Sequence, residues 1–266
     1  MGCHPMRQLR QPRLAEIIAA SLRDDILTGK LTEGDSLPRQ EDLFTRFRVS
    51  LPAVREAMRI LETEGLVEVR RGNVGGAVVH LPTAERTAQM IAMVLQTRSA
   101  TPGDVSGALA NIEPVCARLC AAREDRGTEV VPALRAAIET QRAEFEDISR
   151  YNANARRFHE VLVERCGNET MILVIGALET IWSAHESAVW DEVPPEAEKT
   201  RRIALSDHER ILDAIEKGDE QASASIAGAH LAATRRSTLA TSAAGGGRPA
   251  TIHANLVGGL DGTAGR

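Results

Sequence analysis

The sequence is poor in aromatic residues and contains no long apolar run. Aromatic side chains make up only 3% of its 266 residues, so its cores must be built mainly from aliphatic side chains, as helical bundles commonly are. A β-rich or sugar-stacking protein is therefore disfavoured. No stretch approaches the roughly 18 to 20 apolar residues that cross a bilayer, and the N-terminus lacks the apolar segment of a signal peptide. We expect a cytoplasmic protein with no membrane attachment.

Cysteine is also scarce. The four residues, Cys3, Cys116, Cys120 and Cys166, form no C-x-x-C pair and no dense disulfide framework, so we expect reduced thiols. Cys116 and Cys120 lie one helical turn apart, which suggests either a redox or metal site or a soft apolar helix face. We favour the apolar face.

A surplus of positive charge is missing. The formal net charge is −5, which disfavours a protein that coats nucleic acid by bulk electrostatics. Residues 1–81 nevertheless carry 12 Lys and Arg against 11 Asp and Glu, so the acidity lies in the rest of the chain. The length suits two domains, and the N-terminal one is better able to approach DNA.

The N-terminal part has the pattern of a helix-turn-helix. Residues 1–12, with two prolines, are predicted to be a flexible arm. Apolar residues at helical spacing then predict three helices, near residues 13–27, 39–47 and 50–64. Only Arg48, Val49 and Ser50 separate the second helix from the third, which begins with Ser50 as its N-cap and Pro52 in its first turn. This spacing is that of a helix-turn-helix.

A small β-hairpin is predicted to follow the third helix. Residues 66–70 and 77–81 are short and rich in valine, and the segment 71–76 between them is rich in glycine. Together with the three helices, this hairpin predicts a winged helix-turn-helix domain over residues 13–82.

The third helix is predicted to read DNA in the major groove. Leu51, Arg55 and Arg59 share one face at i, i+4 and i+8, opposite an inward apolar stripe. Arginine can grip guanine O6 and N7 or clamp a phosphate. The alternative is a charged helix face that meets only solvent. The predicted DNA-binding residues, including those of the wing, are Arg39, Ser50, Arg55, Arg59, Arg70, Arg71, Asn73, Gly75 and Gly76.

The rest of the chain is predicted to be an all-α helical bundle over residues 83–236, which makes the protein mainly α. Breaks are expected at 101–104, 166–168, 193–195 and 217–219. The segment 237–266, rich in Gly, Ala and Thr, is predicted to be a disordered tail.

In its N-terminal part the sequence resembles the GntR family of regulators, specifically the FadR-like branch. The segments that carry this resemblance are Ile26 to Leu31, Gly34 to Pro38, Val49-Ser50, Val54 to Glu62, Glu64 to Leu66 and Arg70 to Gly76. The C-terminal part resembles the FCD ligand-binding domain that accompanies this winged helix. The matching elements are Asp104-Val105, Ile112 to Pro114, Phe158-His159, Gly167-Asn168, His208, Ile211 to Ile215, Gly218-Asp219 and His230-Leu231.

The FCD resemblance implies a divalent metal beneath a pocket for a small carboxylic acid effector. Relatives often bind the metal through one Asp and three His, and the three histidines correspond here to His159, His208 and His230. Zinc, nickel or manganese would suit such a set. The competing interpretation is that these histidines are partly buried and simply hydrogen-bonded. His185 and His253 are expected to be incidental.

The sequence departs from both family patterns. Leu51 stands where relatives usually have Arg after the turn serine, and it can meet only a thymine methyl group or make no base contact. Arg39-Gln40 replaces a common Ser-Glu. Ala155 replaces the aspartate four residues before the first histidine, and Leu109 replaces an arginine on the first ligand-domain helix. The metal affinity, the effector chemistry or the use of the pocket is therefore expected to differ.

These patterns predict a regulator, chiefly a repressor, that binds operator DNA as a homodimer. Twofold symmetry doubles the contacts of one helix-turn-helix across a near-palindromic site. One alternative is a metal-dependent enzyme using the three histidines, although the sequence has no nucleophile elbow, P-loop, dinucleotide fingerprint or paired carboxylate motif. The other is a small-molecule-binding protein with a degenerate DNA-binding domain. We expect no enzymatic activity.

Overall fold

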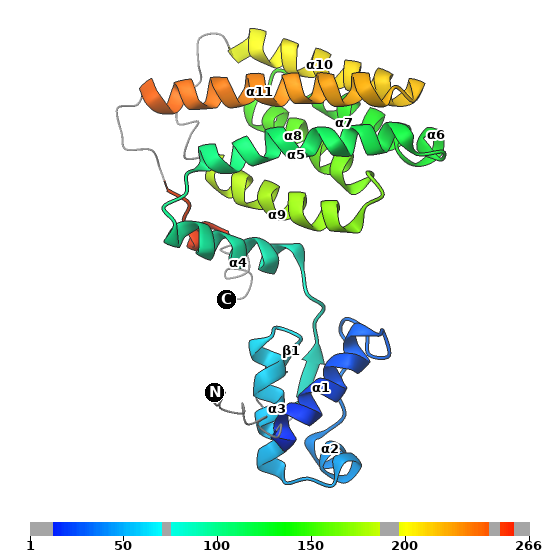
Figure 1. The fold of residues 1–266 in the computed structure, drawn as a ribbon, viewed down its shortest axis with the longest axis vertical. Helices are drawn as coiled ribbons and strands as arrows, with labels where there is room; N and C mark the ends of the chain where they lie inside the picture. The colour runs from blue at the N-terminus through cyan, green and yellow to red at the C-terminus, as the bar shows by residue number, and fades with distance from the viewer. Residues whose placement is uncertain (1–12, 71–75, 187–196, 245–250, 258–266) are drawn as a thin grey trace, which may run out of the picture. The chain divides into compact units, whose positions relative to one another are not determined.

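The structure is a computed structural model that describes residues 13–70, 76–186, 197–244 and 251–257. The chain divides into two compact units, residues 1–83 and residues 84–266, which are drawn in Figure 1. Each unit has its own hydrophobic core.

The first unit is a winged helix-turn-helix, as the sequence predicts. Its elements are α1 (Leu14–Leu27), α2 (Gln40–Phe47), α3 (Leu51–Thr63), β1 (Val67–Arg70) and β2 (Gly76–Val79). The two strands pair antiparallel, with Val67 opposite Val79 and Arg70 opposite Gly76. The backbone of Ser36 bridges to Val78 and so extends this small sheet by one more partner.

The tight turn between α2 and α3 consists of three residues, each with a different structural role. Arg48 ends α2 in the left-handed conformation, with φ 51° and ψ 47°, a backbone state that costs an ordinary L-residue about 1–2 kcal/mol. Val49 is buried in the core of the unit. Ser50 is the extended N-cap of α3, and Pro52 lies in the first turn of that helix.

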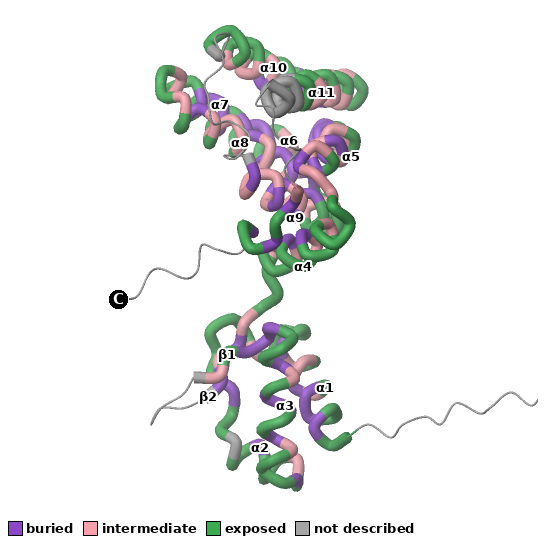
Figure 2. The backbone as a smooth tube through the Cα atoms, turned by 90° about the vertical axis from the view of Figure 1, so that its left-hand side faces the viewer, coloured by how far each residue is buried: buried purple, intermediate pink, exposed green. Residues whose placement is uncertain are grey.

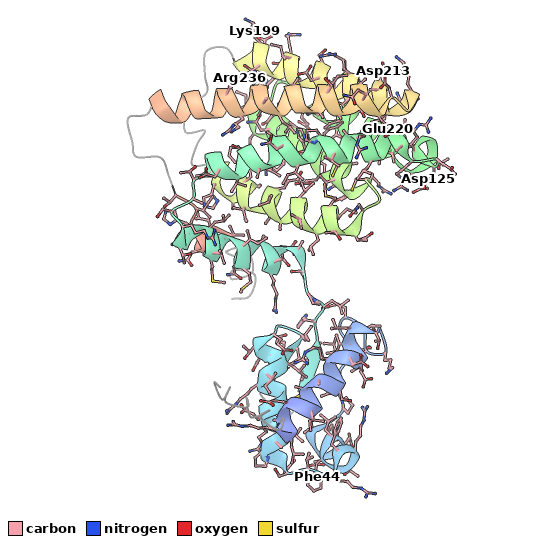
Figure 3. The ribbon with its side chains drawn as sticks, viewed as in Figure 1. Phe44, Asp125, Lys199, Asp213, Glu220 and Arg236 are labelled. Carbon is pink, nitrogen blue, oxygen red and sulfur yellow. The ribbon has the colours of Figure 1, made fainter. Side chains whose placement is uncertain are left out.

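The core of the first unit fixes how α3 is rotated about its axis. Val54, Ala57, Met58 and Leu61 are buried against α1 and α2, and Figure 2 shows this alternation of buried and exposed positions along the tube. On α2, Leu43 faces the core and Phe44 does not. Its ring is 46% exposed and projects from the outer side of the unit in Figure 3, because it lies about 100° around the helix from Leu43.

In its described residues the second unit is helical apart from the connections, which confirms the predicted bundle. Its helices are α4 (Ala84–Thr97), α5 (Pro102–Ala122), α6 (Arg126–Glu129), α7 (Val131–Ala143), α8 (Ile148–Glu164), α9 (Glu169–Glu186), α10 (Ala197–Lys217) and α11 (Glu220–Ala244). None of the helices within the described ranges is long and apolar enough to cross a membrane. The break expected at 193–195 lies outside the described residues.

Helices α5 and α11 form the most extensive contact of the bundle and lie side by side in Figure 1. Small residues allow this approach. A Cβ on Gly228 would lie 3.5 Å from the ring of Pro114, and a Cβ on Gly107 would lie 3.2 Å from the guanidinium of Arg235. The start of α5 is fixed by a reciprocal cap, in which Thr101 and Asp104 each bond the other's backbone N–H.

The expectation of a disordered tail over residues 237–266 is wrong for two segments. Residues 237–244 continue α11, and residues 251–257, which include a 3₁₀ turn (Ala254–Leu256), complete the core of the second unit. Ile252, Ala254 and Val257 are buried there. Composition alone does not predict this, because only a few apolar side chains of a Gly- and Ala-rich stretch join a core that the helices of the unit supply.

The docked segment 251–257 is held by backbone hydrogen bonds as well as by its apolar side chains. The N–H of Ile252 donates to the carbonyl of Ala100 at 2.8 Å. The N–H of His253 donates to Nε2 of His185 at 2.9 Å, and that of Ala254 donates to Oε1 of Gln96 at 3.0 Å. Buried backbone donors are therefore satisfied by α4, by α9 and by the turn that follows α4.

Truncation of Ile252 tests this packing. The side chain is fully buried, so Ile252→Ala should lower the free energy of unfolding by about 2–4 kcal/mol, because it removes buried methylenes and leaves a cavity. Leu256→Ala is the matched control, since Leu256 lies in the same turn and is 50% exposed. The measurement is urea unfolding of both variants. Equal stability of the two would contradict the docking of this segment.

Candidate DNA interface and histidine cluster

The outward face of α3 carries the residues predicted to meet DNA. Leu51 is 38% exposed, and Arg55 and Arg59 are both exposed on the same side. The opposite stripe is buried, so the helix cannot turn these side chains inward without unpacking the unit. The packing thus brings Leu51, Arg55 and Arg59 together on one solvent-facing surface.

The polar side chains on this surface form few hydrogen bonds or ion pairs with the rest of the described protein. Within the described residues, Arg55 forms no hydrogen bond or ion pair. Arg59 Nη1 lies 3.7 Å from Glu56 Oε2, and both side chains are more than half exposed, so the pair contributes little. The side chain of Ser50 makes no capping hydrogen bond. These groups are available for base edges or phosphates.

The structure describes only some of the remaining predicted DNA-binding residues. Arg39 is the exposed N-cap of α2. Arg70 ends β1 and Gly76 begins β2, directly opposite each other. The other three residues of the prediction, Arg71, Asn73 and Gly75, lie outside the described residues.

Three histidines from three helices converge inside the second unit. His159 lies on α8, His208 on α10 and His230 on α11, and their ligand nitrogens all lie within 4.8 Å of one another. His208 and His230 are buried, and the side chain of His159 is 17% exposed. Nε2 of His208 and Nε2 of His230 are 3.2 Å apart.

Each of these histidines has an acceptor on its other ring nitrogen. Nδ1 of His159 donates to Oε1 of Glu113 at 2.5 Å, and Nδ1 of His208 donates to Oε1 of Gln141 at 2.8 Å. Nδ1 of His230 faces Oδ2 of Asp207 at 3.4 Å. Because these oxygens only accept, each Nδ1 carries the proton and each Nε2 presents a lone pair.

Such acceptors were not predicted, although they have the form of the groups that orient metal-bound imidazoles. Glu113 belongs to the Ile112 to Pro114 element, and Asp207 directly precedes His208. Gln141 gives no sequence signal, because it reaches the cluster from α7 only once the helices are packed.

Burial favours the neutral form of His208 and of His230. It lowers the pKa of His208 well below its ordinary value, and charge repulsion from His159 and His230 adds to this effect. Burial, followed by repulsion from His159, lowers the pKa of His230 to about 4, although Asp207 opposes the change. At neutral pH protons therefore do not compete for the Nε2 lone pairs of His208 and His230.

The donor set fits a divalent cation. Two nitrogens that each lie about 2.0–2.1 Å from one ion are separated by roughly 3.0–3.4 Å, and the observed 3.2 Å lies in that range. Without a proton or a cation between them, the two lone pairs would repel. Within the described residues the group contains three histidines and no carboxylate, which agrees with the presence of Ala155 in place of the family's aspartate.

A second buried acid lies in this part of the bundle. Glu179 on α9 is 8% exposed, and within the described chain its Oε1 has no hydrogen-bond partner. Burial, followed by repulsion from Glu113, raises the pKa of Glu179 to about 9. Glu179 is therefore neutral at physiological pH. No sequence pattern distinguishes Glu179 from the other acidic residues of the bundle.

The other residues singled out in the sequence contribute to packing or to internal hydrogen bonds. Cys116, Cys120 and Cys166 are buried and free, and burial raises the pKa of Cys116 and that of Cys120, which suits the predicted apolar face. Leu109 is buried in the core. His185 is not incidental: its Nδ1 donates to the carbonyl of Ile181 and its Nε2 accepts from the backbone of His253.

Comparisons with known proteins identify the class of both units. A model described as "Bacterial regulatory proteins, gntR family" matches residues 14–78, and one described as "FCD domain" matches residues 104–233. The chain belongs to the GntR family of bacterial regulators and carries an FCD domain. It is a DNA-binding transcription regulator whose C-terminal unit is of the small-molecule-binding type.

Individual relatives agree with this assignment. The chain is 28% identical over 220 residues to the HTH-type transcriptional repressor NanR of Cronobacter sakazakii, covering 80% of each protein. It is 26% identical over 218 residues to NanR of Salmonella typhimurium, again covering 80% of each. A solved structure of Streptococcus agalactiae GntR has the same fold, with a TM-score of 0.65 and 20% identity over 84% of this chain and 99% of that one.

The buried acid Glu179 predicts an unusual pH response. Because its pKa is raised in the folded state, the folded chain holds a proton that the unfolded chain has released above about pH 4.5, and this lowers stability as pH rises towards 9. Glu179→Gln should therefore stabilise the protein by about 1–3 kcal/mol at pH 7 and give no gain below pH 4.5.

Urea unfolding at several pH values measures this effect, with Glu169→Gln at an exposed position of the same helix as the control. A gain that does not change with pH would show that Glu179 ionises normally in the folded protein.

Proposed function

We propose that the chain is a repressor that binds operator DNA through α3 and the wing and that releases it in response to a small carboxylic acid. The observation that carries the DNA-binding part is the outward face of α3, where Leu51, Arg55 and Arg59 stand opposite a fully packed stripe. A helix presented in this way fits the major groove, about 12 Å wide.

The proposed contacts divide into two kinds. Arg55 and Arg59 approach base edges or nearby phosphates from the middle of the helix. Ser50 and Arg39 lie at the N-termini of α3 and α2, where side-chain and backbone donors suit phosphate oxygens. The same role is proposed for the wing residues Arg70, Arg71, Asn73, Gly75 and Gly76, because arginine supplies positive charge and glycine has no side chain to keep backbone N–H groups from a phosphate.

We propose that the protein acts as a homodimer. Met90, Met93 and Val94 recur at i, i+3 and i+4 on α4, and all three are substantially exposed. Leu173 and Val174, on the neighbouring helix α9, are exposed as well. Several exposed apolar side chains on two neighbouring helices favour a subunit contact. The molar mass in solution, expected at twice 28.7 kDa, measures it.

The second unit is proposed to hold a divalent metal, such as zinc, nickel or manganese, through His159, His208 and His230. A bound ion would keep open coordination positions and supply positive charge for an effector carboxylate. This chain lacks both Asp at position 155 and Arg at position 109, so metal charge is the proposed anchor for the carboxylate. Effector binding then acts by favouring one arrangement of the two DNA-binding units over another.

We infer that the histidine cluster regulates and does not catalyse. The match to two regulator domain types supports this, and the outward face of α3 disfavours a degenerate DNA-binding domain. The buried acids Glu113 and Glu179 belong to the bundle interior that the effector is proposed to approach.

Removal of Arg55 tests the DNA interface. Arg55→Ala should weaken operator binding by about 1–3 kcal/mol, because a guanidinium that grips a base or phosphate is lost. Gel-shift titration at fixed salt measures this, with thermal unfolding as a check on the fold. Arg98→Ala is the control, since it removes the same charge from an exposed position of the other unit. Equal affinity of both variants would remove Arg55 from the interface.

Metal binding is tested by dialysis against zinc, nickel or manganese followed by elemental analysis. The wild type should retain one ion per chain and unfold at a higher temperature with metal than with chelator. His230→Gln should lose more than about tenfold in affinity, because one of three ligands is gone. His253→Ala, at an exposed histidine, should behave as wild type. A wild type that stays metal-free would leave the histidines a purely hydrogen-bonded cluster.

A further inference from the structure

Leu51 is an exposed apolar residue at a position where polar side chains usually read DNA. It is the first residue of α3 and is 38% exposed, whereas four residues on the other side of the same helix are buried. Its side chain therefore contributes little to the core. A single exposed leucine is common on protein surfaces, so its position, and not its exposure alone, carries the argument.

The position is that of a base-contacting residue. In helix-turn-helix proteins the N-terminal residues of the recognition helix lie over base edges in the major groove. Leu51 shares one face with Arg55 and Arg59, one and two turns further along the helix. If the arginines meet DNA, Leu51 lies at the deeper, N-terminal end of the same surface.

The surroundings of Leu51 fix its direction. Ser50 is held in an extended N-cap conformation, and Pro52 follows in the first turn, where its ring restricts the backbone. The turn before them is locked by the left-handed Arg48 and the buried Val49. The backbone at Leu51 is therefore restricted before it meets DNA, so little backbone entropy is lost on contact.

Only one group in the major groove suits this side chain. Base edges there present hydrogen-bond donors and acceptors, which a leucine leaves unpaired, and the C5-methyl group of thymine, which it can pack against. We propose that Leu51 is a specificity-determining residue that selects a pyrimidine C5-methyl group, thymine in unmodified DNA, at one position of each operator half-site.

This inference rests on the proposed placement of α3 in the groove. Burying one methyl group against Leu51 corresponds to about a three- to tenfold change in affinity per half-site. The same methyl group is carried by 5-methylcytosine, so a cytosine at that position should bind better when it is methylated.

The experiment uses the full-length protein and a duplex selected from a random library. Each thymine of the selected site is replaced in turn by deoxyuridine, which removes only the C5-methyl group. The wild type should lose about three- to tenfold in affinity at one symmetry-related pair of thymines. Leu51→Ala should bind the thymine and uracil duplexes equally. Leu27→Ala, at a 60% exposed leucine of α1, should keep the wild-type response.

Two results would overturn the inference: no thymine whose methyl group matters, or a methyl effect that is unchanged in Leu51→Ala. Arg55→Ala separates this failure from failure of the placement. If Arg55→Ala weakens binding while no replacement of thymine by deoxyuridine changes the affinity, α3 contacts DNA and Leu51 does not contribute to base selection. If neither Arg55→Ala nor Leu51→Asp changes the affinity, α3 does not lie in the groove. Thermal unfolding of every variant confirms that the fold is intact.

Discussion

The burial of one side of α3 is the constraint on which the DNA-binding unit depends. Val54, Ala57, Met58 and Leu61 can be packed in only one rotation of the helix, and that rotation determines which residues face solvent. The residues that stabilise the unit and the residues proposed to contact DNA therefore lie on opposite sides of the same thirteen-residue helix. The turn before the helix adds a second restriction, because the left-handed Arg48 and the buried Val49 set the point at which the recognition surface begins.

In the second unit, helix packing positions polar groups in a similar way. Its three imidazoles come from separate helices, and each is oriented by an acceptor from α5, α7 or α10. Every helix that supplies a ligand or an acceptor must be in place before the nitrogens converge. The geometry of the cluster therefore depends on the packing of five helices, so the proposed ligand would be coupled to their arrangement.

The sequence was sufficient for features that depend on local pattern. The helix-turn-helix spacing, the glycine-rich hairpin and the three histidines follow from periodicity, turn residues and resemblance, and the outward positions of Leu51, Arg55 and Arg59 follow from counting around a helix. Features that depend on the meeting of distant segments were missed. Gln141 and Glu179 have no local signal, and the role of His185 exists only because the backbone of His253 returns to it.

The docking of residues 251–257 also determines when the second unit can complete its fold during synthesis. The DNA-binding unit, completed by β2 at Val79, is synthesised first, whereas the core of the second unit needs side chains as late as Val257. At about 5–20 residues per second, ribosomes take roughly 10–35 s to cover that distance. During this interval a nascent chain carries a complete DNA-binding unit, whereas the surface of α4 and α9 that receives residues 251–257 is not yet covered.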